Sequence, residues 1–302
     1  MSWQQGELRT EEQEDETLGL LMRWLMRGVL ALLVLAALGT AWVYARSEWL
    51  LRQRWAVPAP TALKAVARTD AGAIAEGGRL ARLHGCLGCH GMSATGDVLL
   101  DEPLIARIVS PSLVDAVRRY DDAQLAAIVR HGVRPDGTTM VVMPSQSFAS
   151  LTDPDLARIL GYLRSLPDTP GPRSVRMLGP VGRLGIVVGK YKTSAQRVAE
   201  GGMPPPAPDA LRVRGRYLAA TTCSICHGPA LSGEEHPEGL APDLRIVGAY
   251  SREDFARLMR TGIGLGGRKL GVMTGWAREN LSAMNDEEVA SLFSYLDSLP
   301  AH

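Results

Sequence analysis

The sequence repeats one five-residue motif, Cys-x-x-Cys-His, and this repetition limits what the chain can fold around. The motif occurs at residues 86–90 and again at residues 223–227. These two motifs contain all four cysteines of the 302 residues, so no cysteine remains for a structural disulfide. Such low cysteine use suits a reducing compartment, but the histidine after each pair changes that interpretation.

The spacing within the motif explains its chemistry. Two cysteines three positions apart lie on one side of a helical turn, where their sulfurs can form thioether bonds to the two vinyl groups of one haem. The histidine lies one turn after the first cysteine, so its imidazole can bind the iron as an axial ligand. The sequence therefore predicts two covalently bound haem c groups, one held by Cys86, Cys89 and His90, the other by Cys223, Cys226 and His227.

Structural zinc is the first alternative, because Cys-x-x-Cys pairs also bind zinc. In a zinc ribbon the second pair follows after about 15 to 20 residues, whereas Cys89 and Cys223 are 134 positions apart. A redox-active dithiol is the second alternative, and it would not require a histidine after each pair. The complete motifs favour haem over both.

The same landmarks follow each motif in the same order, which indicates a duplication. A Pro-x-Leu segment comes first, at Pro111 and at Pro242, and each copy closes with Tyr-Leu-x-Ser-Leu-Pro, ending at Pro167 and Pro300. Between them, five residue pairs share an offset of 130: Tyr120 and Tyr250, Arg130 and Arg260, Gly132 and Gly262, Gly137 and Gly267, Met143 and Met273. The repeat predicts two similar domains.

The closing segments of the two copies are the clearest helices. Apolar side chains recur at helical spacing in both: Leu156, Ile159, Leu160, Leu163 and Leu166, then Val289, Leu292, Phe293, Leu296 and Leu299. Thr152 and Asn285 are the expected N-caps. Shorter helices are predicted over residues 122–130 and 253–260, and no run alternates as a strand would. The expected fold class is all-α.

An apolar run near the N-terminus predicts a membrane anchor. Residues 28–45 carry no charge, and Trp24, Trp42, Tyr44 and Trp49 lie where interfacial aromatic side chains are expected. The alternative is a cleaved secretory signal, with Val43 and Ala45 as the small-residue site before Arg46. The long charged segment ahead of the run favours retention.

These observations divide the chain into six segments: an acidic tail at 1–22, the anchor at 23–49, a linker at 50–71, a first domain at 72–167, a Gly- and Pro-rich connector at 168–210, and a second domain at 211–302. The connector is expected to lie across a domain surface, and the alternative is a contact with the membrane or a partner subunit. The net charge of +1 gives no sign of nucleic-acid binding.

The landmarks resemble class I cytochrome c in a diheme, membrane-anchored form, over residues 72–167 and 211–300. The resemblance implies all-helical domains in which a helix before each motif crosses the closing helix. It also implies that the carbonyls of Pro111 and Pro242 bind the imidazole N–H groups of the two axial histidines. Haem attachment machinery of this kind works on the outer face of the membrane. We therefore expect a single-pass protein of the cell inner membrane with both haem domains in the periplasm.

The family also implies a distal methionine from a late loop of each domain. Met140 and Met143 both lie in the first such loop, and the constant offset favours Met143, because it pairs with Met273. In the second domain Met284 competes with Met273, but its position at the start of the closing helix favours a structural role. His/Met ligation would place both haems on the high-potential side.

The remaining candidates are weaker. Arg130 and Arg260 recur before the two loops and are possible contacts for haem propionates, with an exposed helix-end arginine as the alternative. His84, His131 and His236 have no counterpart in the other repeat, so we expect them to be hydrogen-bonded or solvated. Met92, Met177, Met203 and Met259 are expected to be packing or surface residues.

The leading functional hypothesis is an electron carrier with no small-molecule substrate. It would pass single electrons from a respiratory or dehydrogenase donor to a terminal acceptor such as an oxidase, as a tethered shuttle or as a subunit of a respiratory complex. The rival is an enzyme similar to diheme peroxidases, which needs one open haem and is disfavoured by Met143 and Met273. A haem-based sensor is a third class, but the tail is too short to be an output domain.

Overall fold

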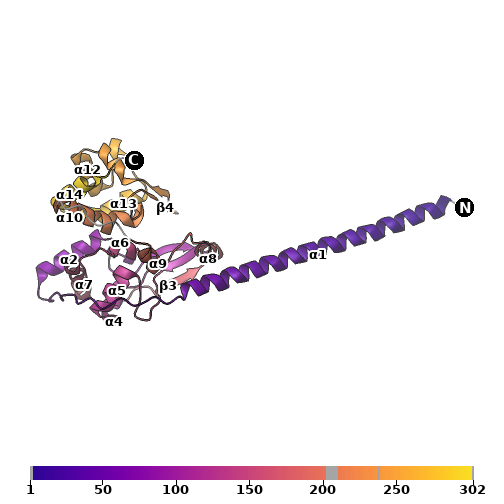
Figure 1. Cartoon of the computed structure of the whole chain (residues 1–302), viewed down its shortest axis with the longest axis horizontal. Helices are drawn as coiled ribbons and strands as arrows, with labels where there is room; N and C mark the ends of the chain where they lie inside the picture. Colours follow the sequence, from indigo (N-terminus) through magenta and orange to yellow (C-terminus); the bar gives the residue numbers. More distant parts are fainter. Residues whose placement is uncertain (1–2, 202–209, 237–238, 301–302) are drawn as a thin grey trace.

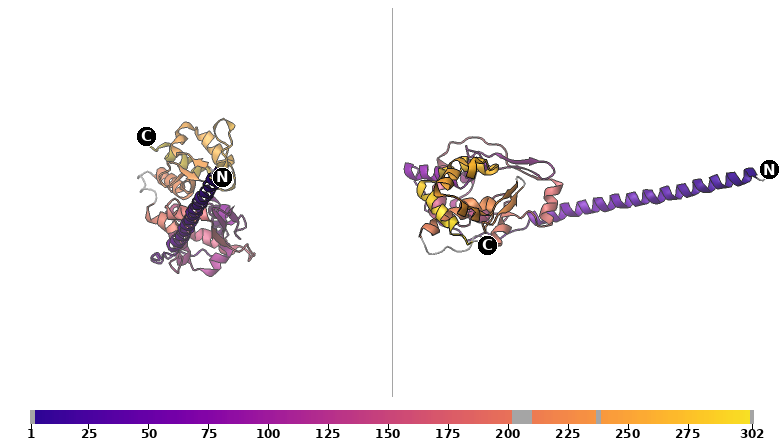
Figure 2. Two further views of the ribbon diagram at one scale, coloured as in Figure 1. Left: turned by 90° about the vertical axis from the view of Figure 1, so that its right-hand side faces the viewer. Right: turned by 90° about the horizontal axis from the view of Figure 1, so that it is seen from above.

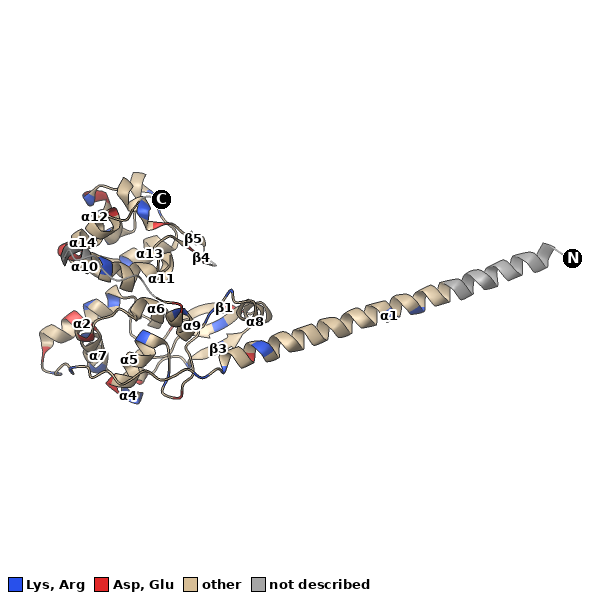
Figure 3. Ribbon diagram, in the orientation of Figure 1, with Lys and Arg blue, Asp and Glu red and all other residues tan. Residues whose placement is uncertain are grey.

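The computed structural model describes the backbone of residues 3–201, 210–236 and 239–300, and the side chains from residue 18 onward within these ranges except 210–212. A long helix, α1 (Trp3–Leu51), projects from a body of two domains (Figure 1). Within the described chain, one helix is long and apolar enough to cross a membrane, over Leu18–Leu51 with a mean hydropathy of 2.0. Figure 3 shows that α1 carries no charged residue between Arg27 and Arg46. The predicted tail and anchor thus share one continuous helix over their described part.

Domain 1 is helical around its motif. Its helices are α2 (Ala71–Leu83), α3 (Cys86–His90), α4 (Leu113–Arg119), α5 (Asp122–His131), α6 (Ser145–Phe148) and α7 (Asp153–Ser165). Helix α2 packs against α7. A Cβ added at Gly77 would lie 2.0 Å from the carbonyl oxygen of Arg158, so the two backbones touch at a position that needs glycine.

Domain 2 repeats this plan. Its helices are α10 (Ala210–Leu218), the π-helical η1 (Ala219–Cys223), α11 (Ser224–His227), η2 (Leu244–Ala249), α12 (Arg252–Thr261), η3 (Leu265–Gly267), α13 (Val272–Glu279), η4 (Leu281–Ala283) and α14 (Asp286–Asp297). Helix α10 packs against α14. A Cβ at Gly215 would lie 2.0 Å from the carbonyl oxygen of Ser291, so the crossing of first and last helix is the same in both domains.

The predicted helices of both domains are confirmed. Thr152 accepts a hydrogen bond from the amide of Asp155, and Asn285 forms a capping box with Glu288. The helices expected at 122–130 and 253–260 are α5 and α12, each within one residue of the predicted bounds. Periodicity and capping residues were sufficient to locate these elements.

No run of the sequence alternates as a strand would, yet the described residues form short strands beside the expected helices. One antiparallel sheet has the order β1 (Val98–Glu102), β2 (Ala106–Val109) and β3 (Val175–Leu178), and β4 (Glu234–His236) pairs antiparallel with β5 (Gly239–Ala241). Strands of three to five residues are too short to show alternation. Strand β3 also comes from the connector, so its pairing with β2 depends on a contact between distant parts of the chain.

The described part of the connector lies across domain 1. After β3 it forms α8 (Pro180–Val187) and α9 (Ser194–Ala199). The amide of Gly179 donates to the carbonyl of Ile105 at 2.9 Å, and the amide of Ser194 donates to the carbonyl of Met140 at 3.0 Å. Backbone hydrogen bonds at both ends therefore hold the connector against the first domain.

The two domains dock through matching positions. Arg79 of α2 binds Glu288 of α14, with Nη1 and Oε2 2.7 Å apart, and the hydroxyl of Tyr217 in α10 donates to Asp155 of α7 at 2.6 Å. Arg79 and Tyr217 each lie two residues after the crossing glycine, and Asp155 and Glu288 each lie third in the closing helix. Each domain thus uses the same two positions to bind the other, as in an interface between identical subunits. The left view of Figure 2 shows domain 2 above domain 1 from a further direction.

Candidate haem-binding sites

The first motif forms its own short helix directly after α2. Gly85, with φ of +73°, makes the turn, and α3 then carries Cys86, Cys89 and His90. Nδ1 of His90 donates to the carbonyl oxygen of Pro111 at 2.8 Å. Because a carbonyl only accepts, Nδ1 carries the proton and Nε2 keeps its lone pair for a metal.

The histidine of the second motif makes the same type of hydrogen bond, although a different backbone conformation leads into this motif. The chain runs from α10 through the π turn η1, with Cys223 as its last residue, into α11. Nδ1 of His227 donates to the carbonyl oxygen of Pro242 at 2.7 Å. His236 adds a bond between its Nε2 and the carbonyl of Cys226 at 2.6 Å, so this unrepeated histidine is hydrogen-bonded to the motif. The histidines of both motifs therefore have the tautomer that a metal ligand needs.

Burial favours the neutral forms of the first cysteine and of the histidine in each motif. It raises the pKa of the Cys86 thiol to about 12 and that of the Cys223 thiol to about 11, and it lowers the pKa of His90 and His227. Reactive dithiols lie where the thiol pKa is lowered, so the redox alternative has no support. In the described residues no group of three or more His, Cys, Asp or Glu side chains could hold a metal ion.

A cavity lies between the first motif and the loop that follows α5. Cys86, Cys89 and His90 line one side, and Met140 and Met143 line another. The apolar stripe predicted for the closing helix also faces the cavity, through Leu156, Ile159, Leu160 and Leu163. An apolar cavity with two sulfurs, an imidazole and a thioether around it fits a covalently attached haem.

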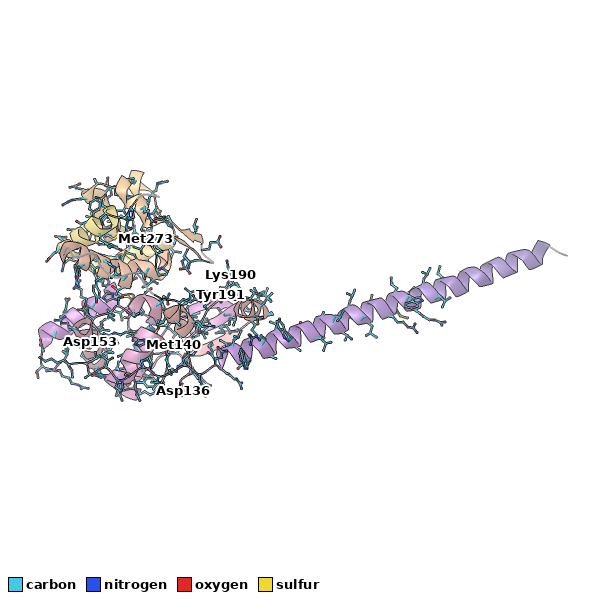
Figure 4. The ribbon with its side chains drawn as sticks, in the orientation of Figure 1. Asp136, Met140, Asp153, Lys190, Tyr191 and Met273 are labelled. Atoms are coloured by element: carbon cyan, nitrogen blue, oxygen red, sulfur yellow. The ribbon has the colours of Figure 1, made fainter. Side chains whose placement is uncertain are left out.

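The structure brings both candidate methionines of domain 1 to this cavity. Their backbones are held by α9, because Met140 accepts from the amide of Ser194 and Met143 accepts from its hydroxyl. Figure 4 labels Met140 in domain 1 and Met273 in domain 2. Met273 lies half-buried at the start of α13, against the core.

The other methionines divide between core and surface. Met284 is 1% exposed and belongs to the hydrophobic core, as a structural residue would. Met259 is also buried in the core, whereas Met92 and Met177 are exposed. Met203 lies outside the described residues.

The predicted arginines bind carboxylates of their own domains. Nη2 of Arg130 lies 2.7 Å from Oδ1 of Asp153, and Nη2 of Arg260 lies 2.6 Å from Oδ1 of Asp286. These aspartates begin the two closing helices. The alternative of an exposed helix-end arginine is wrong for Arg130, which is 8% exposed. Both arginines thus join the helix before the loop, α5 or α12, to the closing helix of the same domain.

Sequence reasoning missed four residues that line the first cavity. Arg134 and Arg176 lie there, close enough for the charge of Arg176 to add to burial in lowering the pKa of Arg134. Ile225 and Trp276 reach the same cavity from domain 2. Arg176 belongs to β3 of the connector, and Ile225 lies inside the second motif. No signal in the sequence links these residues, because tertiary contacts alone bring them to the first motif.

His84 is not solvated. It is fully buried beside the ring of Tyr217, with ring centroids 6.1 Å apart. Burial lowers its pKa to about 4, so the ring is neutral. Its burial follows from the docking of the two domains, which the sequence does not show.

The chain belongs to the cytochrome c family, whose model matches residues 74–167 and 213–300. The predicted resemblance is therefore confirmed, and the chain is a diheme electron-transfer cytochrome that carries two covalently bound haem c groups.

Three relatives are subunits of dehydrogenases. The chain is 27% identical over 290 residues to the cytochrome c subunit of alcohol dehydrogenase (quinone) from Gluconacetobacter polyoxogenes, covering 80% of this chain and 59% of that protein. It is 24% identical over 258 residues to the fructose dehydrogenase cytochrome subunit of Gluconobacter japonicus, covering 76% and 53%. It is 26% identical over 274 residues to the gluconate 2-dehydrogenase cytochrome c subunit of Pantoea cypripedii, covering 76% and 60%. The chain thus spans little more than half the length of these relatives.

Proposed function

We propose that this cytochrome is the electron-transfer subunit of a membrane-bound dehydrogenase. It takes single electrons from a dehydrogenase partner and passes them to a terminal acceptor such as an oxidase. The three relatives support the choice of donor, since each is named as a cytochrome subunit of a dehydrogenase. We further propose that α1 crosses the inner membrane once and leaves both domains in the periplasm.

The proposal rests on one observation: residues of the second Cys-x-x-Cys-His motif lie beside the first motif, at the contact between the two domains. Ile225, between the two cysteines of the second motif, lines the cavity beside Cys86 and Cys89. Ser224 donates a hydrogen bond to Ser147 of α6 at 2.8 Å, buried between the domains. Haem-attachment motifs with residues on both sides of one buried contact suit relay of electrons through the chain.

Each site is held by this chain's residues in the same way. We propose Nε2 of His90 and of His227 as one axial ligand, with Met143 and Met273 as the other. The carbonyls of Pro111 and Pro242 fix the imidazole rings and raise their basicity. Haem iron ligated in this way supplies one-electron exchange at high potential. Arg134 and Arg176 are positioned to neutralise propionates at the first site.

The test uses the full chain in its native membrane. Membranes given ethanol, D-fructose or D-gluconate should reduce the haem bands of this cytochrome with at least one of these substrates, and deletion of the chain should abolish oxygen uptake with that substrate. Reduction by none of the three would contradict the proposed donor class. Rapid binding of carbon monoxide to a reduced haem would contradict closed coordination and favour the peroxidase alternative.

A further inference from the structure

We propose that α8 of the connector lies on the membrane surface beside α1 and places an apolar patch in the lipid interface. The α8 patch consists of Val181, Leu184 and Val188, with Leu104 beside them. This inference rests on the proposed anchoring by α1. It assigns a second, peripheral membrane contact to a segment between the two haem domains.

Helix α8 is fastened to the end of α1 that adjoins the body. The guanidinium of Arg183 lies over the ring of Tyr44 at 4.7 Å. Its Nη1 also donates to Oγ of Ser47 at 3.0 Å and lies 3.2 Å from Oε2 of Glu48. Figures 1 and 2 place α8 beside the base of α1, on the side of the body from which α1 leaves. The position of α8 is therefore fixed relative to the proposed span.

The opposite side of α8 is committed to domain 1. A Cβ at Gly182 would lie 2.1 Å from the carbonyl oxygen of Ile105, so the helix backbone packs directly on the turn between β1 and β2. Gly185 packs against the ring of Tyr191, and Ile186 is buried. These contacts determine which side of α8 faces outward.

The outward side carries apolar residues. Val181, Leu184 and Val188 follow one another at i, i+3 and i+7, and they are 50%, 47% and 67% exposed. The amide of Val181 donates to the carbonyl of Leu104, which is also exposed, so this side chain extends the patch. Arg183 is the one charged residue of α8, and its contacts with α1 take it away from the patch.

The position at which α8 contacts α1 favours lipid as the partner that covers the α8 patch. The uncharged run of α1 ends at Ala45, and α8 contacts residues 44, 47 and 48. Trp42 and Trp49, both exposed, flank these residues and are the side chains expected at a bilayer interface. At 1.5 Å per residue, the contact lies within about 5 Å of the end of the run. An apolar helix face held at that level meets the interfacial region of the bilayer.

The experiment places a fluorophore on single cysteines of the full-length holoprotein in phosphatidylcholine and phosphatidylglycerol vesicles. Native cysteines are consumed by the thioether bonds, so Leu184→Cys and Val188→Cys can be labelled selectively. Glu253→Cys in α12, at the end of the body away from α1, is the matched control, and Trp42→Cys reports on the anchor. Haem absorbance checks that each variant is folded and loaded.

We expect the label at 184 and 188 to emit at shorter wavelength than at 253 and to be quenched at least twofold by lipids carrying a spin label near the headgroup. Water-like, unquenched emission at 184 and 188 with a quenched label at 42 would overturn the proposal and leave the anchor intact. A water-like label at 42 would overturn the anchor itself. Shielding at 184 that lipid-borne quenchers do not reach would overturn the proposal in favour of a protein partner.

Discussion

Domain 1 and domain 2 hold the histidines of their Cys-x-x-Cys-His motifs in the same way but differ in what surrounds these side chains. His90 with Pro111 and His227 with Pro242 are equivalent pairs from each domain's own sequence. The first cavity is completed by β3 of the connector and by Ile225 and Trp276 of domain 2. The duplicated residues therefore orient the histidines of the two motifs. The connector, which has no duplicate, and the docking of the domains determine what surrounds the first of them.

The two domains differ in the backbone conformation that links their first helix to the Cys-x-x-Cys-His motif. Domain 1 breaks its helix at His84 and Gly85, and domain 2 continues through a π turn. There are nine positions from Gly77 to Cys86 but eight from Gly215 to the first cysteine of the second motif. The extra residue of domain 1 lies in the turn against which Trp276 packs. A single-residue difference between the copies thus creates an asymmetric contact inside a symmetric interface.

The largest expected effect tests whether the proposed methionine ligands of the two domains are equivalent. Met143→Leu and Met273→Leu should each lower the midpoint potential of one haem only, by a sizeable part of the about 0.8 V range that axial ligands span, because the thioether favours ferrous iron. Redox titration of the haem bands measures this. Met140→Leu is the matched control and should leave both potentials unchanged. A fall with Met140→Leu instead would transfer the first ligand to Met140.

The next prediction concerns the asymmetric contact. Gly85→Ala should cost about 1–2 kcal/mol for a left-handed backbone and about 1–3 kcal/mol more for overpacking. The new Cβ would lie 2.6 Å from the ring of Trp276. Urea unfolding followed by circular dichroism gives the free energy of unfolding.

Gly266→Ala is the control for this experiment, since φ there is +67° and nothing lies within 4 Å. This variant should lose only the free energy that a left-handed backbone costs a non-glycine residue, about 1–2 kcal/mol. Trp276→Leu should recover most of the overpacking cost in the double variant, because the two residues touch. Equal losses at the two glycines would show that the domains do not dock through Trp276.

These contacts mark the limit of what the sequence predicts. Thr152 and Asn285 were found because caps and apolar periodicity are local signals. The hydrogen bonds of the motif histidines to Pro111 and Pro242 were anticipated because the landmarks that mark them are local too. Arg176 and Trp276 were not found, because a strand in the connector and a second domain bring them to the first site. The burial of His84 was not predicted for the same reason: it depends on Tyr217, which is distant in sequence.

Acid should weaken the interface between the two domains through Glu288. Glu288 is 4% exposed in its side chain and binds Arg79 and Arg214, each at 2.7 Å. Burial alone would raise its pKa, but the bonds from Arg79 and from the amide of Asn285 outweigh burial and lower it. A lowered folded-state pKa means that this stabilisation is complete above about pH 4.5 and is lost as the pH falls through the folded-state value.

Glu288→Gln removes that pH dependence, and the variant should be less stable than the wild type at pH 7 by about 1–3 kcal/mol. Urea unfolding at pH 3 to 7 should therefore give curves that converge for the two proteins as the pH falls. Asp155→Asn at the matching position keeps a hydrogen-bond acceptor for Tyr217 and serves as the control. If the free energy of unfolding changed in parallel with pH for wild type and Glu288→Gln, the carboxylate of Glu288 would not stabilise the interface between the domains.

The smallest expected effect lies at the edge of the same interface. Lys190 follows α8 and lies 3.4 Å from Glu235 of β4, but the two side chains are 68% and 78% exposed. Exposed pairs of this kind contribute about 0–1 kcal/mol, because water screens the charges and both side chains lose rotamer freedom. Lys190→Ala should therefore change the free energy of unfolding by less than about 0.5 kcal/mol. A larger loss would mean that the connector, and not the buried pairs at Glu288 and Asp155, sets the relative position of the two domains.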